Sequence, residues 1–349
     1  MADPVHEWTD DQIKALEKRI RKVYRQAQEE VQAKLDDYLR RFRIKDEIKR
    51  DQVKRGVITA KEYKEWRTGQ IIVGKRWEKL RDELAHDYHN ANQKAKEMAQ
   101  RSQSQIYAEN INYATYTVEV QANLDTDFTL YDESTVDRIM MNDPDMLPPP
   151  GKKVSKRIAE GKDVRWNNNQ IQAVMLQGIL QGESIPALAK RLEQVTDKNH
   201  KAAIRNARTM ATGAQNAGRI DGFVRAKNMG IDLLQEWLAT LDLRTRHEHR
   251  MLDKQRVAVG KPWMIDGYQI RFPGDPAAPG YLIYNCRCTV RGIVIGLEPQ
   301  ARKYRSTAAI GNMSYEEWKK QKKSQSNRIT LPEEKAKSIK QYYINKYKL

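Results

Sequence analysis

The chain has few cysteines, few phenylalanines and no long apolar segment. Its 349 residues include 2 Cys and 4 Phe. Two cysteines cannot build a framework of disulfides, which fits a reducing compartment. No run approaches the roughly 18 apolar residues of a membrane-spanning helix, so we expect no membrane span. The opening segment MADPVHEW lacks the basic and apolar parts of a secretory signal, so we expect no signal peptide.

Several patterns of catalytic sites are also missing. Gly213 and Gly218 resemble a phosphate-binding loop only in their glycines, because they fall inside a predicted helix with no strand before it. The acidic cluster of a two-metal nuclease is not visible. No serine or cysteine stands at a recognisable spacing from a base that would activate it.

Positive charge is in excess, and it is confined to the C-terminal part of the chain. The formal net charge is +17, from 63 Lys and Arg against 46 Asp and Glu. Residues 1–150 carry 26 basic and 28 acidic side chains, residues 151–298 carry 24 and 14, and residues 299–349 carry 13 and 4. Such a charge implies a polyanionic partner, either nucleic acid or an acidic membrane surface. The balanced N-terminal part is better suited to contacts with proteins.

Residues 10–50 are predicted to form one long helix. Apolar or small side chains recur every three or four residues from Ile13 to Phe42, in a nearly heptad pattern with one extra four-residue step. A stripe this narrow is typical of an antiparallel helix pair within one protein. An intermolecular coiled coil is the alternative.

A second long helix is expected after Gly56. Thr59 and Glu62 form a capping-box signature at its start. It extends to about residue 116, with Gly69 and Gly74 as points where it could kink or break. Residues 117–131 alternate weakly between apolar and polar, which favours short paired strands.

The rest of the chain is punctuated by proline and glycine. Pro144 and residues 148–150, all proline, cannot continue a helix, so we place the first domain boundary there. Further helices are expected at residues 135–141, at 167–181, from a Ser184 cap to about 194, and from about 199 to a stop at Gly230. Strands are expected at residues 233–239, 263–265, 268–272 and 289–295.

These patterns together predict a predominantly helical α+β protein in three parts. Residues 1–145 form a long helical arm, and residues 151–298 form a helical domain with a small antiparallel sheet. Residues 299–349 form a basic helical tail. The tail contains one helix capped by Ser314 and Glu317 and a final Lys- and Tyr-rich helix after Pro332.

Side chains with metal-binding chemistry are concentrated between residues 240 and 288. Cysteine and histidine are preferred zinc ligands, and this segment contains Cys286, Cys288, His247 and His249. If residues 244–253 are a short helix, the two histidines diverge by about 200°, so one of them can join the cysteines. We expect His249, Cys286 and Cys288 as candidate ligands, with a fourth group from a carboxylate or water.

Two alternatives to a resident zinc ion remain open for this segment. In one, His249 and the two cysteines pack and hydrogen-bond as a structural junction. In the other, they form the centre of a metal-dependent nuclease or transferase. A disulfide between Cys286 and Cys288 is not expected, because so small a ring is strained.

The same segment resembles a known family. The spaced Asp-x-Arg-Thr, His, Leu-Asp and Asn-Cys-Arg-Cys elements are similar to those of the phage head morphogenesis family, the minor head proteins similar to protein F of phage Mu. The likeness covers about residues 160–295, and residues 1–150 resemble the helical part of such proteins only loosely. Its motif positions are Arg208, Thr209, Asp242, Arg244, Thr245, His249, Leu252, Asp253, Asn285, Cys286, Arg287 and Cys288.

This resemblance implies a virion assembly protein rather than an enzyme. Such proteins are minor capsid components, bound to the portal inside the procapsid, and they assist head assembly and DNA packaging or ejection. The implied location is the capsid interior, with the host cytoplasm during assembly, and scaffold or major capsid protein are further partners. The family domain also appears fused to toxin domains, but residues 299–349 are too short and too polar for one.

Sequence-independent binding of double-stranded DNA is expected from the basic tail. Lysine and arginine bind phosphates without reading bases, and no helix-turn-helix or zinc-finger spacing is present. The tail cations expected to contact DNA are Arg302, Lys303, Arg305, Lys319, Lys320, Lys322 and Lys323.

The sequence departs from the family pattern at two places. The family commonly has Leu-Asp-Gly, whereas here Lys254 follows Asp253, so the turn could differ. Some members have a Cys-x-x-Cys pair that aligns on Arg246 and His249. Histidine can replace one of those ligands, but Arg246 cannot replace the other, which favours a structural role for the motif.

Overall fold

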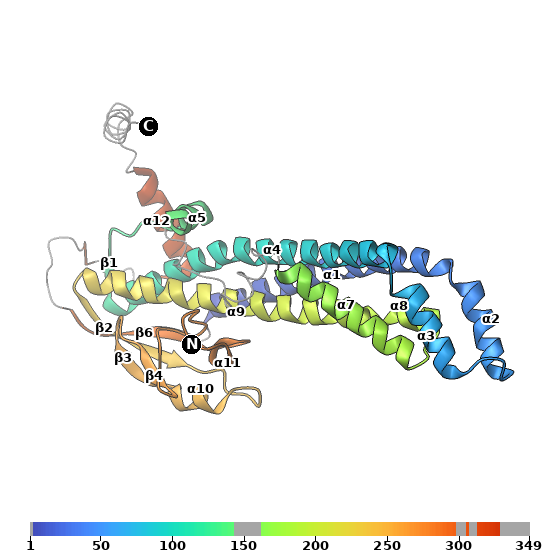
Figure 1. Cartoon of the computed structure of the whole chain (residues 1–349). Coiled ribbons are helices and arrows are strands. Elements are labelled where there is room, and N and C mark those ends of the chain that lie inside the picture. Colours follow the sequence, from blue (N-terminus) through green and yellow to red (C-terminus); the bar gives the residue numbers. More distant parts are fainter. Residues whose placement is uncertain (1–2, 143–161, 298–304, 307–312, 329–349) are drawn as a thin grey trace, which may run out of the picture.

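The computed structural model describes residues 3–142, 162–297, 305–306 and 313–328. Three long helices lie side by side in an elongated bundle (Figure 1), and they are α1 (Pro4–Arg40), α4 (Lys75–Ala122) and α9 (Glu193–Asn228). The 48 residues of α4 correspond to about 72 Å of helix. The predicted α+β class, mainly helical, is confirmed.

The two ends of the bundle differ in structure. Helices α2 (Arg43–Lys54) and α3 (Ala60–Ile71) form one end, and most of the strands gather at the other (Figure 1). Helices α7 (Lys162–Leu180) and α8 (Ile185–Arg191) lie along the half nearer α2 and α3. The remaining helices of the described ranges are α5 (Glu133–Asn142), α10 (His247–Leu252), α11 (Gly280–Ile283) and α12 (Tyr315–Arg328). None of the helices in the described ranges has a long enough apolar stretch to cross a membrane.

The strands of the described residues form three small antiparallel sheets. The largest has the order β3-β2-β6, in which Trp237 pairs with Val290 in register, and a bulge lies between Asp232 and Leu233. The other two are the pairs β4-β5 and β1-β7. The strand bounds are β1 (Leu124–Asp125), β2 (Ile231–Leu238), β3 (Arg256–Ala258), β4 (Trp263–Ile265), β5 (Tyr268–Ile270), β6 (Thr289–Leu297) and β7 (Arg305–Ser306). The four strands expected between residues 233 and 295 are present.

The apolar stripe of α1 packs inside the molecule. Leu16 and Ile20 contact the part of α4 around Ala95, whereas Leu35 and Leu39 contact its earlier part around Leu84. The contacts therefore run in opposite directions along the two helices. The expected antiparallel helix pair within one chain is confirmed.

The prediction of one continuous helix over residues 10–50 is wrong. It ends at Arg40, and α2 begins at Arg43 in a different direction (Figure 1). The buried stripe stops at Phe42, and beyond it Asp46 is buried against Tyr63 and Arg67 of α3. These polar contacts turn α2 towards α3 instead of along α4.

The short strands predicted for residues 117–131 are largely wrong as well. Helix α4 continues to Ala122 and buries Val118 against the rest of the core, so the 3.6-residue period prevails there over the weak alternation. One two-residue strand remains, β1.

Several helix starts follow their capping signals. Thr59 and Glu62 make both bonds of a capping box on α3, and the Ser184 hydroxyl accepts a hydrogen bond from the backbone N–H of Ala187 on α8. Helix α9 starts at Glu193, six residues before the expected position, and Gly230 follows it at φ +88°. The predicted break at Pro148–Pro150 and the helix after Pro332 lie outside the described residues.

Helix α12 is docked on the bundle, which changes the expected role of two tail cations. Trp318 and Lys322 are fully buried. The Lys322 ammonium lies 2.9 Å from Glu119 and 2.7 Å from Asp125, and Lys319 lies 2.8 Å from Glu109. The buried Lys322 cannot meet a phosphate in this arrangement. Lys320 and Lys323 are exposed, whereas Arg302 and Lys303 lie outside the described residues.

The hydrophobic clusters join residues from both sides of the predicted boundary near residue 150. One cluster contains Ile111 of α4 together with Phe223 of α9 and Val290 of β6. Another contains Leu35 and Leu84 together with Ile171 of α7. The arm and the following segment therefore share their cores.

A glycine allows α9 to approach α4 closely. A Cβ atom placed on Gly218 would lie 2.6 Å from the carbonyl oxygen of Tyr107 and 3.2 Å from the backbone nitrogen of Ile111. Backbone atoms of a buried helix cannot move aside as a flexible side chain could.

The first prediction concerns this helix contact. We expect Gly218→Ala to lower the free energy of unfolding by about 2–3 kcal/mol, because the added methyl overpacks the interface. Gly69→Ala is the control: its Cβ would meet nothing within 4 Å, and alanine should stabilise α3 by about 1 kcal/mol. Denaturant unfolding measures both. Equal effects of the two substitutions would contradict the close-approach argument.

The second prediction concerns the turn after α10. Lys254 adopts φ +62°, the left-handed conformation that glycine prefers, so the turn has the geometry expected of Leu-Asp-Gly despite the lysine. We expect Lys254→Gly to raise the free energy of unfolding by about 0.5–1 kcal/mol, since it relieves the strain of a Cβ there. Lys254→Ala keeps the Cβ and should not stabilise. A thermal melt that ranks alanine with glycine would contradict this account.

Candidate functional site

The Asp-x-Arg-Thr element forms a tight turn between β2 and α10. The Asp242 carboxylate accepts a hydrogen bond of 2.9 Å from the backbone N–H of Arg244, and the Thr245 hydroxyl accepts one of 3.2 Å from the backbone N–H of Asp242. Each carboxylate oxygen of Asp242 also accepts a hydrogen bond of 2.7 Å from the Arg287 guanidinium. This bidentate pair holds the pKa of Asp242 well below its ordinary value.

The Asn-Cys-Arg-Cys element is an extended segment that connects α11 to β6. Asn285 begins it at φ +55°, a left-handed conformation that asparagine tolerates better than most residues. Alternate side chains of an extended segment point to opposite sides. Cys286 and Cys288 accordingly point inward, while Arg287 reaches Asp242 on the other side.

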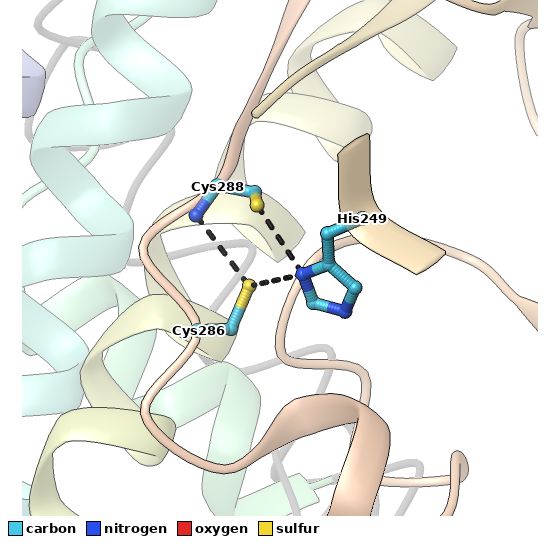
Figure 2. A group of neighbouring side chains, drawn as sticks. All are labelled: His249, Cys286 and Cys288. Atoms are coloured by element: carbon cyan, nitrogen blue, oxygen red, sulfur yellow. Dashed lines mark hydrogen bonds between the residues drawn. The ribbon is translucent and has the colours of Figure 1, made fainter. Parts of the chain in front are cut away.

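His249, Cys286 and Cys288 converge in the interior (Figure 2). The Nδ1 atom of His249 lies 3.5 Å from the Cys286 sulfur and 3.4 Å from the Cys288 sulfur. All three side chains are 2–3% exposed, and both cysteines are free thiols. His247, on the same helix, is exposed. The structure thus brings together the three candidate ligands and leaves out His247.

The two thiols differ in acidity because they share a hydrogen bond. The hydrogen bond with Cys286 lowers the pKa of Cys288 below its ordinary value, and the neighbouring His249 lowers it further. The same contact with Cys288, together with burial, raises the pKa of Cys286.

A polar row on α9 holds the cysteine segment, and the sequence interpretation did not identify Thr212 or Arg219 as part of it. Thr212 donates a 2.9 Å hydrogen bond to the carbonyl of Cys286, and Asn216 donates one of 3.1 Å to the carbonyl of Cys288. Arg219 donates at 3.2 Å to the carbonyl of Val290. The spacing of four and three residues in a helix rich in alanine and glycine is the signal that could have revealed this face.

The remaining motif residues have supporting positions. Leu252 is buried, and the Asp253 carboxylate accepts a 2.9 Å hydrogen bond from the backbone N–H of Ala239 at the end of β2. Thr209 accepts a 3.3 Å hydrogen bond from the backbone N–H of Asn285. Arg208 pairs with Glu17 of α1, and Arg244 is exposed.

A basic surface hollow lies beside the motif, on α1 and α9. Its volume is about 580 Å³, and it is lined largely by cationic side chains. The Arg205 guanidinium lies 4.6 Å from the centre of the Tyr284 ring, next to the cysteine segment. We name this surface the α9 basic hollow, and its charged or histidine lining residues are Glu17, Arg21, Lys198, His200, Lys201, Arg205 and Arg208.

Three comparisons place the chain among known proteins. Residues 169–291 match the family model described as phage Mu protein F like protein. The chain is 24% identical to minor head protein GP7 of Bacillus phage SPP1, over 92% of this chain and 97% of that protein. It is 29% identical to the NAD(+)–arginine ADP-ribosyltransferase EFV of Enterococcus faecalis, over 58% of this chain but 40% of that protein. No solved structure matches.

These likenesses differ in how much of each relative they cover. The chain spans about two fifths of the enterococcal transferase, so the larger part of that protein has no counterpart here. It spans nearly the full length of the SPP1 minor head protein. The motif that carries the family likeness, from Asp242 to Cys288, lies within the matched residues. The resemblance to the phage head morphogenesis family is therefore confirmed, and the chain is a relative of phage minor head proteins.

Proposed function

We propose that this protein is a minor head protein that contacts the portal during procapsid assembly and binds packaged DNA without reading its sequence. The single observation that carries the proposal is its likeness to a phage minor head protein over almost the full length of both chains. The protein acts in the host cytoplasm during assembly and then inside the capsid. Scaffold and major capsid protein are the other partners proposed.

A structural role suits the His–Cys cluster better than catalysis does. The ligating atoms of His249, Cys286 and Cys288 are enclosed, and their side chains are 2–3% exposed. A nucleic acid or a nucleotide substrate cannot contact them in this arrangement. Nuclease or transferase chemistry centred on these residues is therefore not part of the proposal.

The end of the bundle formed by α2 and α3 provides a surface for protein contacts. Ile44 and Ile48 lie one helical turn apart on α2 and are 72% and 54% exposed. Val57 follows α2 and Val73 follows α3 in the chain, and they are 65% and 59% exposed. Exposed apolar side chains at this end of the bundle favour a contact with another protein. We name these four residues the bundle tip and assign the portal contact to them.

The α9 basic hollow provides a surface for phosphates. Five of its charged side chains are cations and one, Glu17, is an anion that is already paired with Arg208. The exposed Lys320 and Lys323 of α12 are a second group of available cations. Each phosphate contact releases counterions, so binding should weaken steeply with salt.

The third prediction tests the bundle tip. We expect full-length protein with Ile44→Asp and Ile48→Asp to lose co-purification with the portal protein of the same phage, since a carboxylate cannot be buried there without a partner. Leu243→Asp is the control, because Leu243 is 99% exposed in the β2–α10 turn, outside the tip. Unchanged capture by the double variant would remove the tip from the proposal. Failure of the unmodified protein to bind portal would remove the portal itself.

The fourth prediction tests the α9 basic hollow. We expect Arg21→Ala, Lys198→Ala and Lys201→Ala together to weaken binding to linear duplex DNA of any sequence and to flatten the log–log salt slope by about 2.7, or about 0.9 per lost phosphate contact. The control removes Lys45 and Lys54 of α2 and Lys75 at the start of α4, which are exposed and do not line the hollow. Equal losses from the two triple variants would show that net charge alone matters, and would refute the assigned surface.

A further inference from the structure

We propose that His249, Cys286 and Cys288 bind one zinc ion, which fastens the short helix α10 to the cysteine segment. Such an ion would contribute to the stability of the protein, whatever its function. One imidazole and two thiolates are a ligand set that zinc prefers.

The distances within the cluster match a tetrahedral zinc site. With Zn–S bonds of about 2.3 Å and a Zn–N bond of about 2.05 Å, tetrahedral angles place each sulfur about 3.5–3.6 Å from the nitrogen. The two sulfur-to-Nδ1 distances are 3.4 and 3.5 Å. All three ligand atoms lie within 4.8 Å of one another, close enough for small side-chain adjustments to bring them around one ion.

The tautomer of His249 is set for a metal at Nδ1. The Nε2 atom lies 2.8 Å from the carbonyl oxygen of Leu282, which can only accept a hydrogen bond, so Nε2 carries the proton. In a neutral imidazole the lone pair is then on Nδ1, the atom that faces both sulfurs (Figure 2). A backbone carbonyl that orients a histidine through its other nitrogen is the usual support of a metal-binding histidine.

The surroundings compensate the charge and hold the ligands in place. Two thiolates and one Zn²⁺ sum to zero, which suits a buried site. The backbone N–H of Cys288 lies 3.4 Å from the Cys286 sulfur, and Thr212 fixes the Cys286 carbonyl from α9. Among the described residues no fourth His, Cys, Asp or Glu joins the cluster, so these three side chains are the protein ligands that we assign. Binding zinc releases the protons of the thiols that are still protonated.

The zinc ion would link three separate elements. His249 belongs to α10, the cysteines precede β6, and the hydrogen bonds of Thr212 and Asn216 connect the cysteine segment to α9. Helix α10 has six residues, too few for a helix to be stable by itself. A metal bond to its middle residue therefore supplies an anchor that local sequence cannot.

The experiment measures metal in the full-length, untagged protein. Purified without chelator, it should contain about one zinc per chain by plasma mass spectrometry. His249→Ala, Cys286→Ser and Cys288→Ser should each reduce this content at least about tenfold. His247→Ala is the matched control, because His247 is exposed two residues away on the same helix and should leave the zinc content unchanged.

Two measurements on the unmodified protein keep the proposal falsifiable if a variant fails to fold. Replacement of zinc by Co²⁺ should give the thiolate-to-cobalt charge-transfer band and the visible bands of tetrahedral cobalt. A chelator should lower the melting temperature, and added zinc should restore it. If the unmodified protein takes up neither zinc nor cobalt and its melting temperature ignores the chelator, the cluster is a set of thiol–imidazole hydrogen bonds and the proposal is overturned.

Discussion

One buried guanidinium, that of Arg219, connects the parts of the molecule on which the rest of the arrangement depends. It is 2% exposed and bonds to Asn110 of α4 at 2.8 Å, to the carbonyl of Val290 in β6 at 3.2 Å, and to both carboxylate oxygens of Asp3 at 2.6 and 3.0 Å. Asp3 also caps α1 through the backbone N–H of His6. Burial alone would raise the pKa of Asp3, but Arg219 holds it below its ordinary value. Since a buried charge without its partner costs about 3–5 kcal/mol, α1, α4 and β6 must assemble together around this side chain.

The parts of the fold that the sequence predicted are those set by neighbouring residues. The capping pairs at Thr59 and Ser184 act within one helical turn, and the strand patterns around Trp237 and Val290 are short runs rich in apolar residues. The divergence of His247 and His249 likewise follows from helix geometry alone. The predictions that were wrong concern features that depend on residues of other elements. The turn of α2 depends on Asp46 meeting α3, and the burial of Lys322 depends on Glu119, 203 residues away.

The candidate site, too, was predictable only in part. The ligand set of His249, Cys286 and Cys288 was predicted from side-chain chemistry, and its convergence is a property of the fold. The likeness to minor head proteins marked Asp242 and Arg287 but could not say that they form a bidentate pair across the turn. Thr212 carries no motif, so its role became visible only when α9 was placed beside the cysteine segment. Of the net charge of +17, not all of the tail's share is available to a partner, because Lys319 and Lys322 form internal ion pairs with Glu109 and Glu119.

The close contact at Gly218 determines the order in which the newly made chain can fold. Helices α1 and α4 can pair once residue 122 has left the ribosome, but the face of α4 around Tyr107 and Ile111 is covered by α9. That face stays open to solvent until residue 228 emerges. Asp3 likewise has no ion-pair partner at this position until Arg219, 216 residues later, has been synthesised. During synthesis the chain is thus a helical hairpin with one uncovered apolar side. At a translation rate of about 5–20 residues per second, this state lasts for several seconds, long enough for a chaperone or another chain to meet it.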